Sequence, residues 1–295
     1  MYKHGIEAIY FAYEPDDRIY VSIGRMLRQK KAVDSIKIFL TANVEDDAFE
    51  DKITGIFKNY RDKTEYKIIY IKRKDFGHGR TRQEAMDSSK YDHVLLITQD
   101  AVPVNDMLTA NLYAALENED AACSYARQEA YSYANEVEKL YRRFNYPAMS
   151  RSKTASDLEK TGIKTFFCSD VCCMYKHDIF DSLGGFDVSL KFNEDSIFAF
   201  HAIKGGYSVE YAADAIVYHS HNDALIKQFR RSRDLARSQK EHPEVFENVS
   251  SENEGIRFFV HSAKYLVKKK DYKDLFILFC TCAVKYAGYF IGKKN

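Results

Sequence analysis

Short apolar runs alternate with segments of helical period through the first hundred residues, and this alternation restricts the chain to a layered α/β sheet. Apolar residues recur at helical spacing in 18–31 and 49–60, and again after Pro103. The runs suited to strands are 6–13, 35–40, 66–71 and 93–98. In folds of this kind the ligand lies beyond the carboxyl ends of the strands, so residues that carry chemistry are expected there.

The second half of the chain is less regular. Residues 128–164 are polar and rich in Tyr and Arg, with little sustained period, which predicts a lid or a poorly packed loop. Strand-like sequence returns over 207–218, after a helical segment at 195–204. Beyond residue 222 the pattern is helical to the end.

Composition limits the class of protein and its partners. With 295 residues, 45% of them hydrophobic, the chain can bury a full core. Its 44 basic and 43 acidic residues leave a net charge of +1, which gives no overall field to attract nucleic acid, and we expect no nucleic-acid partner. The six cysteines show neither the C-x-x-C spacing of a zinc site nor a dense disulfide framework. Together with a polar start that lacks a signal peptide, they favour reduced thiols in the cytoplasm.

The end of the chain carries an apolar run from Leu275 to Val284, with lysines at 268–270 before it and at 293–294 behind it. The run falls short of the roughly 20 uninterrupted apolar residues that span a bilayer. Two interpretations stay open. The segment is a helix that lies in the membrane interface, or it is a helix packed on the catalytic domain or on a second subunit of a homodimer.

An aspartate directly follows the strand expected at 93–98. Asp100 comes two residues after that run, so its carboxylate is expected among the loops at the strand's carboxyl end. A carboxylate there is a natural ligand for Mg²⁺ or Mn²⁺ on a diphosphate, although an Asp in this position is also a common turn former. His219 and His221 lie two residues apart on one face of an extended segment, and one of them could complete the metal site.

Two further motifs stand at expected helix starts. In Gly77-His78-Gly79-Arg80-Thr81-Arg82, the glycine amides, the helix dipole and two guanidinium groups form a candidate anion site. The alternative is an ordinary strand-to-helix loop with solvated arginines. In Asn193-Glu194-Asp195, the carboxylates are either helix caps or, beside a cleft, a general base.

Six motifs in fixed order give the chain a family resemblance. The motifs are Tyr13-Glu14-Pro15-Asp16, Phe76-Gly77-His78-Gly79-Arg80-Thr81-Arg82, Thr98-Gln99-Asp100-Ala101, Gly184-Gly185-Phe186-Asp187, Asn193-Glu194-Asp195 and Tyr218-His219-Ser220-His221-Asn222. Together they resemble the family 2 inverting glycosyltransferases, in the bacterial rhamnosyltransferase branch that builds surface polysaccharides. The resemblance implies a GT-A type fold, with a mixed, mainly parallel sheet flanked by helices and a C-terminal helical extension.

The resemblance also implies roles for individual residues. Asp195 would be the catalytic base, and Asp100 and His219 would hold Mg²⁺ or Mn²⁺. The residues implied at the acceptor are Gly185, Phe186 and Glu194. The residues implied at the nucleotide-sugar are Ala12, Tyr13, Glu14, Asn43, His78, Gly79, Arg80, Arg82, Gln99 and Asp100. Gln99 departs from the family pattern, since it stands where a paired aspartate is usual, and so does Asn43, where the broad family usually has aspartates.

The implied domain organisation divides the chain near residue 240. Residues 1–240 would form the transferase domain, with a donor nucleotide half at 1–120 and an acceptor half at 121–240. Residues 241–295 would form a helical extension that contacts the membrane or a second subunit.

The expected activity is transfer of L-rhamnose from dTDP-rhamnose, with inversion, to a hydroxyl of a glycan or lipid-linked acceptor. The enzyme would work in the cytoplasm or on the cytoplasmic face of the membrane. Four rivals stay open: a transferase that uses UDP-sugars, a sugar nucleotidyltransferase, a retaining transferase, and a noncatalytic glycan-binding scaffold.

Overall fold

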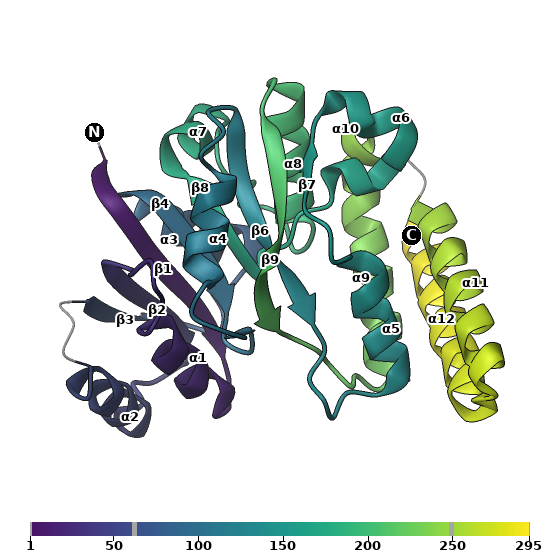
Figure 1. Cartoon of the computed structure of the whole chain (residues 1–295), viewed down its shortest axis with the longest axis horizontal. Coiled ribbons are helices and arrows are strands. Elements are labelled where there is room, and N and C mark those ends of the chain that lie inside the picture. Colours follow the sequence, from purple (N-terminus) through teal and green to yellow (C-terminus); the bar gives the residue numbers. More distant parts are fainter. Residues whose placement is uncertain (1, 61–63, 248–250, 295) are drawn as a thin grey trace.

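The computed structural model describes residues 2–60, 64–247 and 251–294, and its centre is a sheet of nine strands (Figure 1). The strands lie in the order β3-β2-β1-β4-β8-β6-β9-β5, and β7 pairs with β9. Their bounds are β1 Lys3–Tyr13, β2 Ser35–Thr41, β3 Glu65–Ile71, β4 Tyr91–Thr98, β5 Val102–Pro103, β6 Ala121–Glu129, β7 Arg151–Lys153, β8 Cys172–Lys176 and β9 Ser208–Tyr218.

Strand direction decides which loops meet. The strands β3, β2, β1 and β4 are parallel to one another. β8 is antiparallel to both β4 and β6, and β6 is parallel to β9. The carboxyl ends of β1, β4, β6 and β9 therefore lie at the same edge of the sheet.

Helices cover both faces of the sheet. Along β1, Ile6, Ala8 and Tyr10 join one buried apolar cluster, and Ile9 and Phe11 join a second one on the opposite face, as the alternation of side chains in a strand requires. The first cluster takes in α1 (Arg18–Met26), α2 (Asp47–Lys58) and α4 (Leu108–Ala115). The second takes in α3 (His78–Asp87), α7 (His177–Ser182) and α8 (Glu194–Lys204). The expected mixed, mainly parallel α/β sheet flanked by helices is confirmed.

The expectation of a lid or poorly packed loop over 128–164 is wrong. The helix α5 (Glu136–Asn145) lies there, and the Asn135 side chain caps it by accepting a hydrogen bond from the Glu138 amide at 2.8 Å. Val137 and Leu140 bury one face of α5. The period was missed because these few apolar residues stand among charged ones. Short elements follow: β7, η1 (Ala155–Asp157), α6 (Leu158–Thr161) and η2 (Gly162–Phe166).

Four helices close the chain: α9 (Leu225–Glu241), α10 (Pro243–Phe246), α11 (Ser251–Lys269) and α12 (Tyr272–Lys294). Of the helices in the described ranges, α12 alone is long and apolar enough to cross a membrane, with a mean hydropathy of 1.7 in a window that is 22% buried. The uninterrupted apolar run is shorter than a membrane span, but the helix window that includes the residues after Lys285 is long and apolar enough. The expected domain boundary at residue 240 falls near the end of α9 and stays a prediction.

Two glycines bring α12 against α9. A Cβ added at Gly288 would lie 2.4 Å from the Phe229 carbonyl oxygen, and one at Gly292 would lie 2.2 Å from the Arg233 carbonyl oxygen. Both neighbours are helix backbone, which cannot move aside as a flexible side chain can. The two helices therefore pack at a distance that only glycine permits.

We expect Gly288→Ala to lower the free energy of unfolding by roughly 1–3 kcal/mol, because the added methyl group overpacks the contact with α9. Gly255→Ala in α11 is the matched control, since a Cβ there meets nothing within 4 Å. The control should be neutral or stabilising by up to about 1 kcal/mol, the intrinsic helix preference of Ala over Gly. Urea denaturation measures both, and equal stabilities would contradict the close contact.

Candidate active site

Asp100 lies at the sheet edge where the carboxyl ends of the parallel strands meet. It follows β4 by two residues, and β9 ends directly before His219. Asp100 is only 7% exposed. The Thr98 hydroxyl donates a hydrogen bond to its Oδ1 at 3.0 Å and thereby fixes the carboxylate. The sheet topology thus brings Asp100 and His219 together, although they are far apart in the sequence.

His219 and His221 both face this carboxylate. The Nε2 atom of each lies 3.5 Å from Asp100 Oδ2, and the two Nε2 atoms lie 3.0 Å apart. His219 Nδ1 contacts Gln128 Oε1 at 2.8 Å, and because an amide oxygen only accepts, Nδ1 carries the proton and Nε2 keeps its lone pair. One carboxylate oxygen and two imidazole nitrogens that converge in this way fit a divalent first-row cation. The sequence selected His219, and the structure brings His221 equally close.

Burial and charge set the protonation of these three groups. Burial lowers the pKa of His219 to about 4, and burial also lowers the pKa of His221. Burial acts to raise the pKa of Asp100, but attraction to the two histidines and the Thr98 hydrogen bond hold it below its usual range. Because the pKa values of both histidines are lowered, their rings are neutral at pH 7. A neutral ring attracts the carboxylate less than a charged ring would. The Thr98 hydroxyl and Arg18 still stabilise the charged carboxylate, so at pH 7 the cluster is one anion with two neutral donors.

Arg18 is a residue that the sequence analysis missed. Its Nη1 lies 3.9 Å from Asp100 Oδ2, and its guanidinium also binds both carboxylate oxygens of Asp16. It borders a cavity of about 530 Å³ whose lining also includes Tyr133 and His221. Tyr133 is exposed and stacks on Tyr131 with ring centroids 5.1 Å apart, which gives the cavity a flat aromatic wall. The sequence contains a signal for Arg18, since this residue follows two aspartates just after the carboxyl end of the first strand.

Three of the residues implied at the nucleotide-sugar lie around Arg73, which was not predicted from the sequence: Tyr13, Glu14 and Asn43. Arg73 forms an ion pair with Glu14 at 2.7 Å and lies over the Tyr13 ring at 5.5 Å. Its amide donates to Asn43 Oδ1 at 3.3 Å. Tyr13 is 45% exposed, whereas Ala12 is buried in the sheet.

Gln99 joins the ends of β1 and β4. Its side-chain oxygen accepts from the Tyr13 amide at 2.6 Å, and its side-chain NH₂ donates to the Tyr13 carbonyl at 3.0 Å. The amide side chain thus imitates a peptide group and extends the ladder between the two strands. An aspartate lacks the donor for the second bond.

The glycine-rich turn differs from the open anion site expected from the sequence. The Gly79 amide donates to the Leu190 carbonyl at 3.2 Å, and a Cβ on Gly79 would lie 2.2 Å from the Asp187 carbonyl oxygen. Gly79 therefore permits close packing rather than contact with a phosphate. Arg80 is exposed, but Arg82 is 7% exposed at its side chain and forms ion pairs with protein carboxylates. The expectation that both arginines belong to an open anion site is wrong for Arg82, because burial and these partners keep it inside.

Asp195 lies at the start of α8 in a buried group of charged residues. Its Oδ2 accepts from the Asp170 amide at 3.3 Å, and its Oδ1 accepts from the Ser196 amide at 2.7 Å. Burial first, and then the neighbouring Glu194, raise the pKa of Asp195 to about 7. A carboxyl with this pKa can take up a proton near neutral pH, which is what a general base requires.

The residues expected at the acceptor lie mostly inside the protein. Phe186 is 3% exposed and packs against the rings of Tyr175, Phe180 and Phe198, so it contributes to the core and is closed to an acceptor. Gly185 adopts a φ of +70°, and the space of its missing side chain is filled by Gln83. The buried Glu194 binds Arg82.

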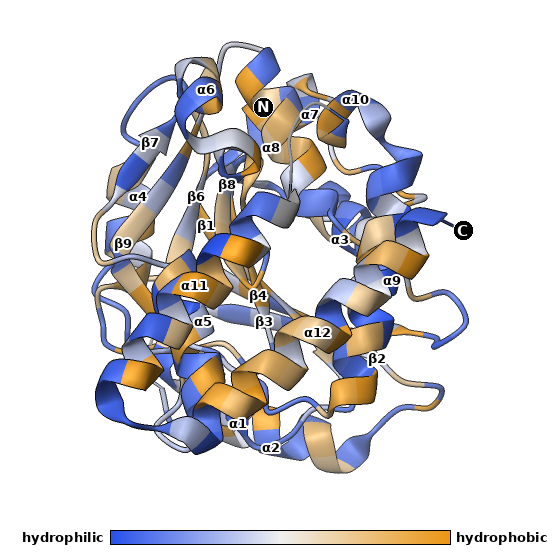
Figure 2. Ribbon diagram, turned by 90° about the vertical axis from the view of Figure 1, so that its right-hand side faces the viewer, coloured by the Kyte–Doolittle hydropathy of each residue, from blue (hydrophilic) through white to orange (hydrophobic). Residues whose placement is uncertain are grey.

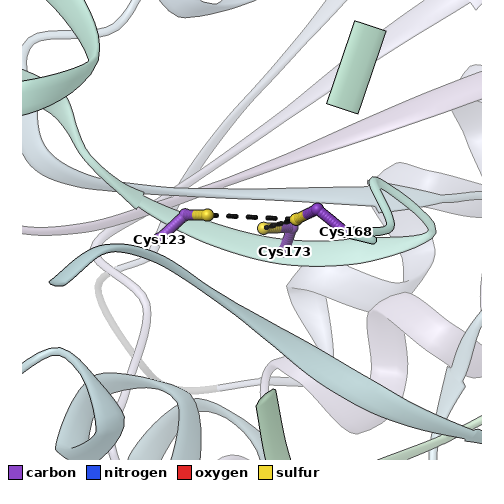
Figure 3. A group of neighbouring side chains, drawn as sticks. All are labelled: Cys123, Cys168 and Cys173. Carbon is purple, nitrogen blue, oxygen red and sulfur yellow. Dashed lines mark hydrogen bonds between the residues drawn. The ribbon is translucent and has the colours of Figure 1, made fainter. Parts of the chain in front are cut away.

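Three cysteines that are distant in the sequence meet in the core (Figure 3). The sulfur of Cys168 lies 3.9 Å from that of Cys123 and 3.6 Å from that of Cys173. Hydrogen bonds from the thiols of Cys168 and Cys173 lower the pKa of Cys123 to about 6. Burial lowers the pKa of the nearby Lys153 to about 8. Cysteine spacing gave no indication of the cluster.

Residues 21–184 match the family model described as glycosyl transferase family 2. The O-antigen chain rhamnosyltransferase WbaN of Salmonella anatum is 32% identical over 228 residues, which are 77% of this chain and 72% of that protein. The O-antigen chain rhamnosyltransferase RfbN of Salmonella typhimurium is 31% identical over 264 residues, which are 86% of this chain and 84% of that protein.

Solved structures resemble the fold at low identity. The mannosyltransferase PcManGT from Pyrobaculum calidifontis, in complex with GDP-Man and Mn²⁺, has a TM-score of 0.64 at 12% identity and covers 97% of this chain and 86% of its own. TarS 1-349 of S. aureus, in complex with UDP-GlcNAc, has a TM-score of 0.54 at 13% identity and covers 96% of this chain and 91% of its own. At such identities the likeness shows the fold alone.

We expect His221→Ala and His219→Ala each to weaken Mn²⁺ binding by roughly 10- to 100-fold or more, since each removes a nitrogen that faces Asp100. Titration followed by Mn²⁺ electron paramagnetic resonance measures the affinity. His4→Ala is the control, because the His4 side chain is 80% exposed and pairs with Asp92. Equal affinity in all four proteins would rule out the cluster as a metal site.

Proposed function

The chain belongs to glycosyl transferase family 2, and from that membership we propose that it transfers L-rhamnose from dTDP-rhamnose, with inversion, onto a hydroxyl of a lipid-linked or growing cell-surface polysaccharide. The names of the two relatives support the sugar and the pathway. The GT-A type fold supports a nucleotide-sugar donor.

The observation that carries the proposal is a pair of carboxyl groups whose pKa values are shifted in opposite directions by their surroundings. Asp100, at the end of β4, is held ionised beside two imidazoles. Asp195, at the start of α8, has its pKa raised to about 7. Acid and base roles are commonly divided in this way, by environments that push two pKa values apart. We assign Asp100 to the donor and Asp195 to the acceptor.

In the proposed reaction Asp195 accepts the proton of the acceptor hydroxyl. The acceptor oxygen forms a bond to the anomeric carbon while the bond from that carbon to the diphosphate breaks, and the nucleoside diphosphate leaves with the electron pair. Attack from the face opposite the diphosphate inverts the configuration. Arg18, rather than the buried Arg82, is the arginine beside Asp100 that is suited to the diphosphate, and Tyr13, Glu14 and Asn43 are suited to the nucleobase.

Asp100, His219 and His221 would hold the divalent cation. When bound there, it would stabilise the negative charge that grows on the departing diphosphate. Two imidazole donors favour Mn²⁺ over Mg²⁺, which prefers an all-oxygen shell. The Mn²⁺ in the complex of the similar mannosyltransferase supports this choice.

Asp195→Asn tests the proposal, because an amide keeps the shape but cannot accept the proton. We expect nucleotide release from dTDP-rhamnose, with acceptor and Mn²⁺ present, to fall by roughly 100- to 10,000-fold. In the wild type kcat should rise with pH through about 7, since Asp195 must lose its proton to act as the base. EDTA should abolish turnover.

Asp214→Asn, at an exposed position in β9, is the matched control. Unchanged turnover in Asp195→Asn would sink the assignment of the base. Release of pyrophosphate would identify a nucleotidyltransferase instead. Turnover of UDP-sugars alone would show that the donor is a UDP-sugar. Retention of configuration in the product would identify a retaining transferase.

We also propose that α12 contacts an anionic membrane surface, on the cytoplasmic face. Exposed aromatic residues repeat along one side of the helix, and this α12 aromatic stripe comprises Tyr272, Phe276, Phe279, Tyr286 and Phe290. Figure 2 shows the hydrophobic character of α12 on this side of the molecule. Lysines at 268–270 and 293–294 flank the stripe. An aromatic face between two basic ends complements anionic headgroups. A homodimer through this helix stays the alternative prediction.

Replacing Phe276 and Phe279 together by Ser should reduce flotation with phosphatidylglycerol vesicles, because both rings are exposed and would enter the interface. Val44→Ser is the control, at a position that is 76% exposed and outside α12. Binding to neutral phosphatidylcholine should be weak for every variant. If wild type and the double variant float equally, the lipid contact is wrong, and a dimer that the double variant disrupts in sedimentation would replace it.

A further inference from the structure

Arg82 is enclosed by two carboxyl groups, by an aromatic ring and by His78, whose Nδ1 lies 3.1 Å from Arg82 Nη1. Its Nε lies 3.1 Å from Asp170 Oδ2, and its Nη1 lies 3.2 Å from Glu194 Oε1. Its guanidinium carbon lies 5.0 Å from the centre of the Phe11 ring. The Arg82 and Asp170 side chains are 7% and 2% exposed, respectively. A guanidinium held in this way cannot turn toward a diphosphate without giving up its buried partners Asp170 and Glu194, which is costly.

The same two carboxylates lie beside Asp195. Glu194 is its neighbour at the start of α8, and the amide of Asp170 donates to Asp195 Oδ2 at 3.3 Å. The charged and titratable groups that act on Asp195 come from four segments: Glu194 from α8, Asp170 and Cys168 from the segment before β8, Arg82 from α3 and Tyr146 from the end of α5. The only cation among them is Arg82, and it faces three carboxyl groups.

The segment that carries Asp170 is fixed at both ends. Cys168 and Cys173 lie on either side of Asp170, and both belong to the buried sulfur cluster with Cys123 (Figure 3). The Tyr175 hydroxyl donates to Asp170 Oδ1 at 2.5 Å. The Asp170 amide therefore has a defined position, and with it the hydrogen bond to Asp195.

We propose that Arg82 is a positioning residue, whose guanidinium joins Asp170 and Glu194 into one buried ion cluster that holds the Asp195 carboxylate in place for the acceptor hydroxyl. This inference rests on the proposed role of Asp195 as the base. It replaces the expectation, implied by the family resemblance, that Arg82 lies at the nucleotide-sugar.

The cluster has an electrostatic consequence with a definite sign. Burial and Glu194 raise the pKa of Asp195, and Arg82 lowers it. Removal of the Arg82 charge should therefore raise that pKa further, and removal of the Glu194 charge should lower it. The two changes should move the pH at which turnover begins in opposite directions.

The experiment compares Arg82→Gln, Arg82→Lys and Glu194→Gln in the full chain, with dTDP-rhamnose, acceptor and Mn²⁺. We expect Arg82→Gln to shift the acidic limb of the kcat profile upward by roughly one pH unit, so that turnover at pH 6 falls by about tenfold. Arg82→Lys keeps the charge and should shift the limb less. Glu194→Gln should shift it toward acid. The KM for the donor should change little in Arg82→Gln.

Glu84→Gln is the comparison at an exposed position of the same helix, and it should leave the pH of the limb in place. A donor KM that rises in Arg82→Gln without a shift of the limb would overturn the inference and return Arg82 to the diphosphate. If Arg82→Gln fails to fold in thermal unfolding, the opposite shifts of Arg82→Lys and Glu194→Gln still decide, since a loss of stability has no preferred pH direction. An active Asp195→Asn would overturn the proposed function itself. An inactive Asp195→Asn with an unmoved limb in the Arg82 and Glu194 variants would overturn this inference alone.

Discussion

The common direction of β1, β4, β6 and β9 is the constraint on which the rest of the site depends. It delivers Tyr13, Asp100, Gln128 and His219 to one edge of the sheet. Gln128 then orients His219 through a hydrogen bond, and Gln99 joins the ends of β1 and β4 through its side-chain amide. The proposed metal ligands and the residues proposed for the nucleobase thus gain fixed positions from backbone pairing before any ligand binds.

The Gln128 side chain also connects the two halves of the proposed chemistry. Its oxygen accepts from His219, and its NH₂ donates to the Ser169 hydroxyl at 2.9 Å. Ser169 precedes Asp170, whose amide holds Asp195. The cluster proposed for the metal and the carboxyl cluster around Asp195 therefore share one buried hydrogen-bonded framework, although the pKa values of their groups are set by different neighbours.

The sequence predicted the fold well where pattern is local. Apolar runs located β1, β2, β3, β4 and β9, although β6 and β8 between β4 and β9 were missed. The positions of Asp100 and Asp195 after a strand and at a helix start were both correct. The sequence could not predict which individual side chains are buried. Arg82 and Arg80 look alike in sequence, yet the direction of a helix face encloses one and exposes the other. Phe186 is likewise a core residue, because a tertiary cluster of rings surrounds it. Arg18 acquires its importance only from the loop that places it beside Asp100.

The glycine contact between α12 and α9 fixes the distance between the two helices. The helix α9 begins at Leu225, four residues after His221, and Gly288 and Gly292 seat α12 directly on its backbone. If α12 rests on a lipid surface, the histidine pair stands at a set height and rotation above that surface. A lipid-linked acceptor must then bring its hydroxyl to that height, so the geometry of one helix pair would select acceptors by their reach as well as by their sugars.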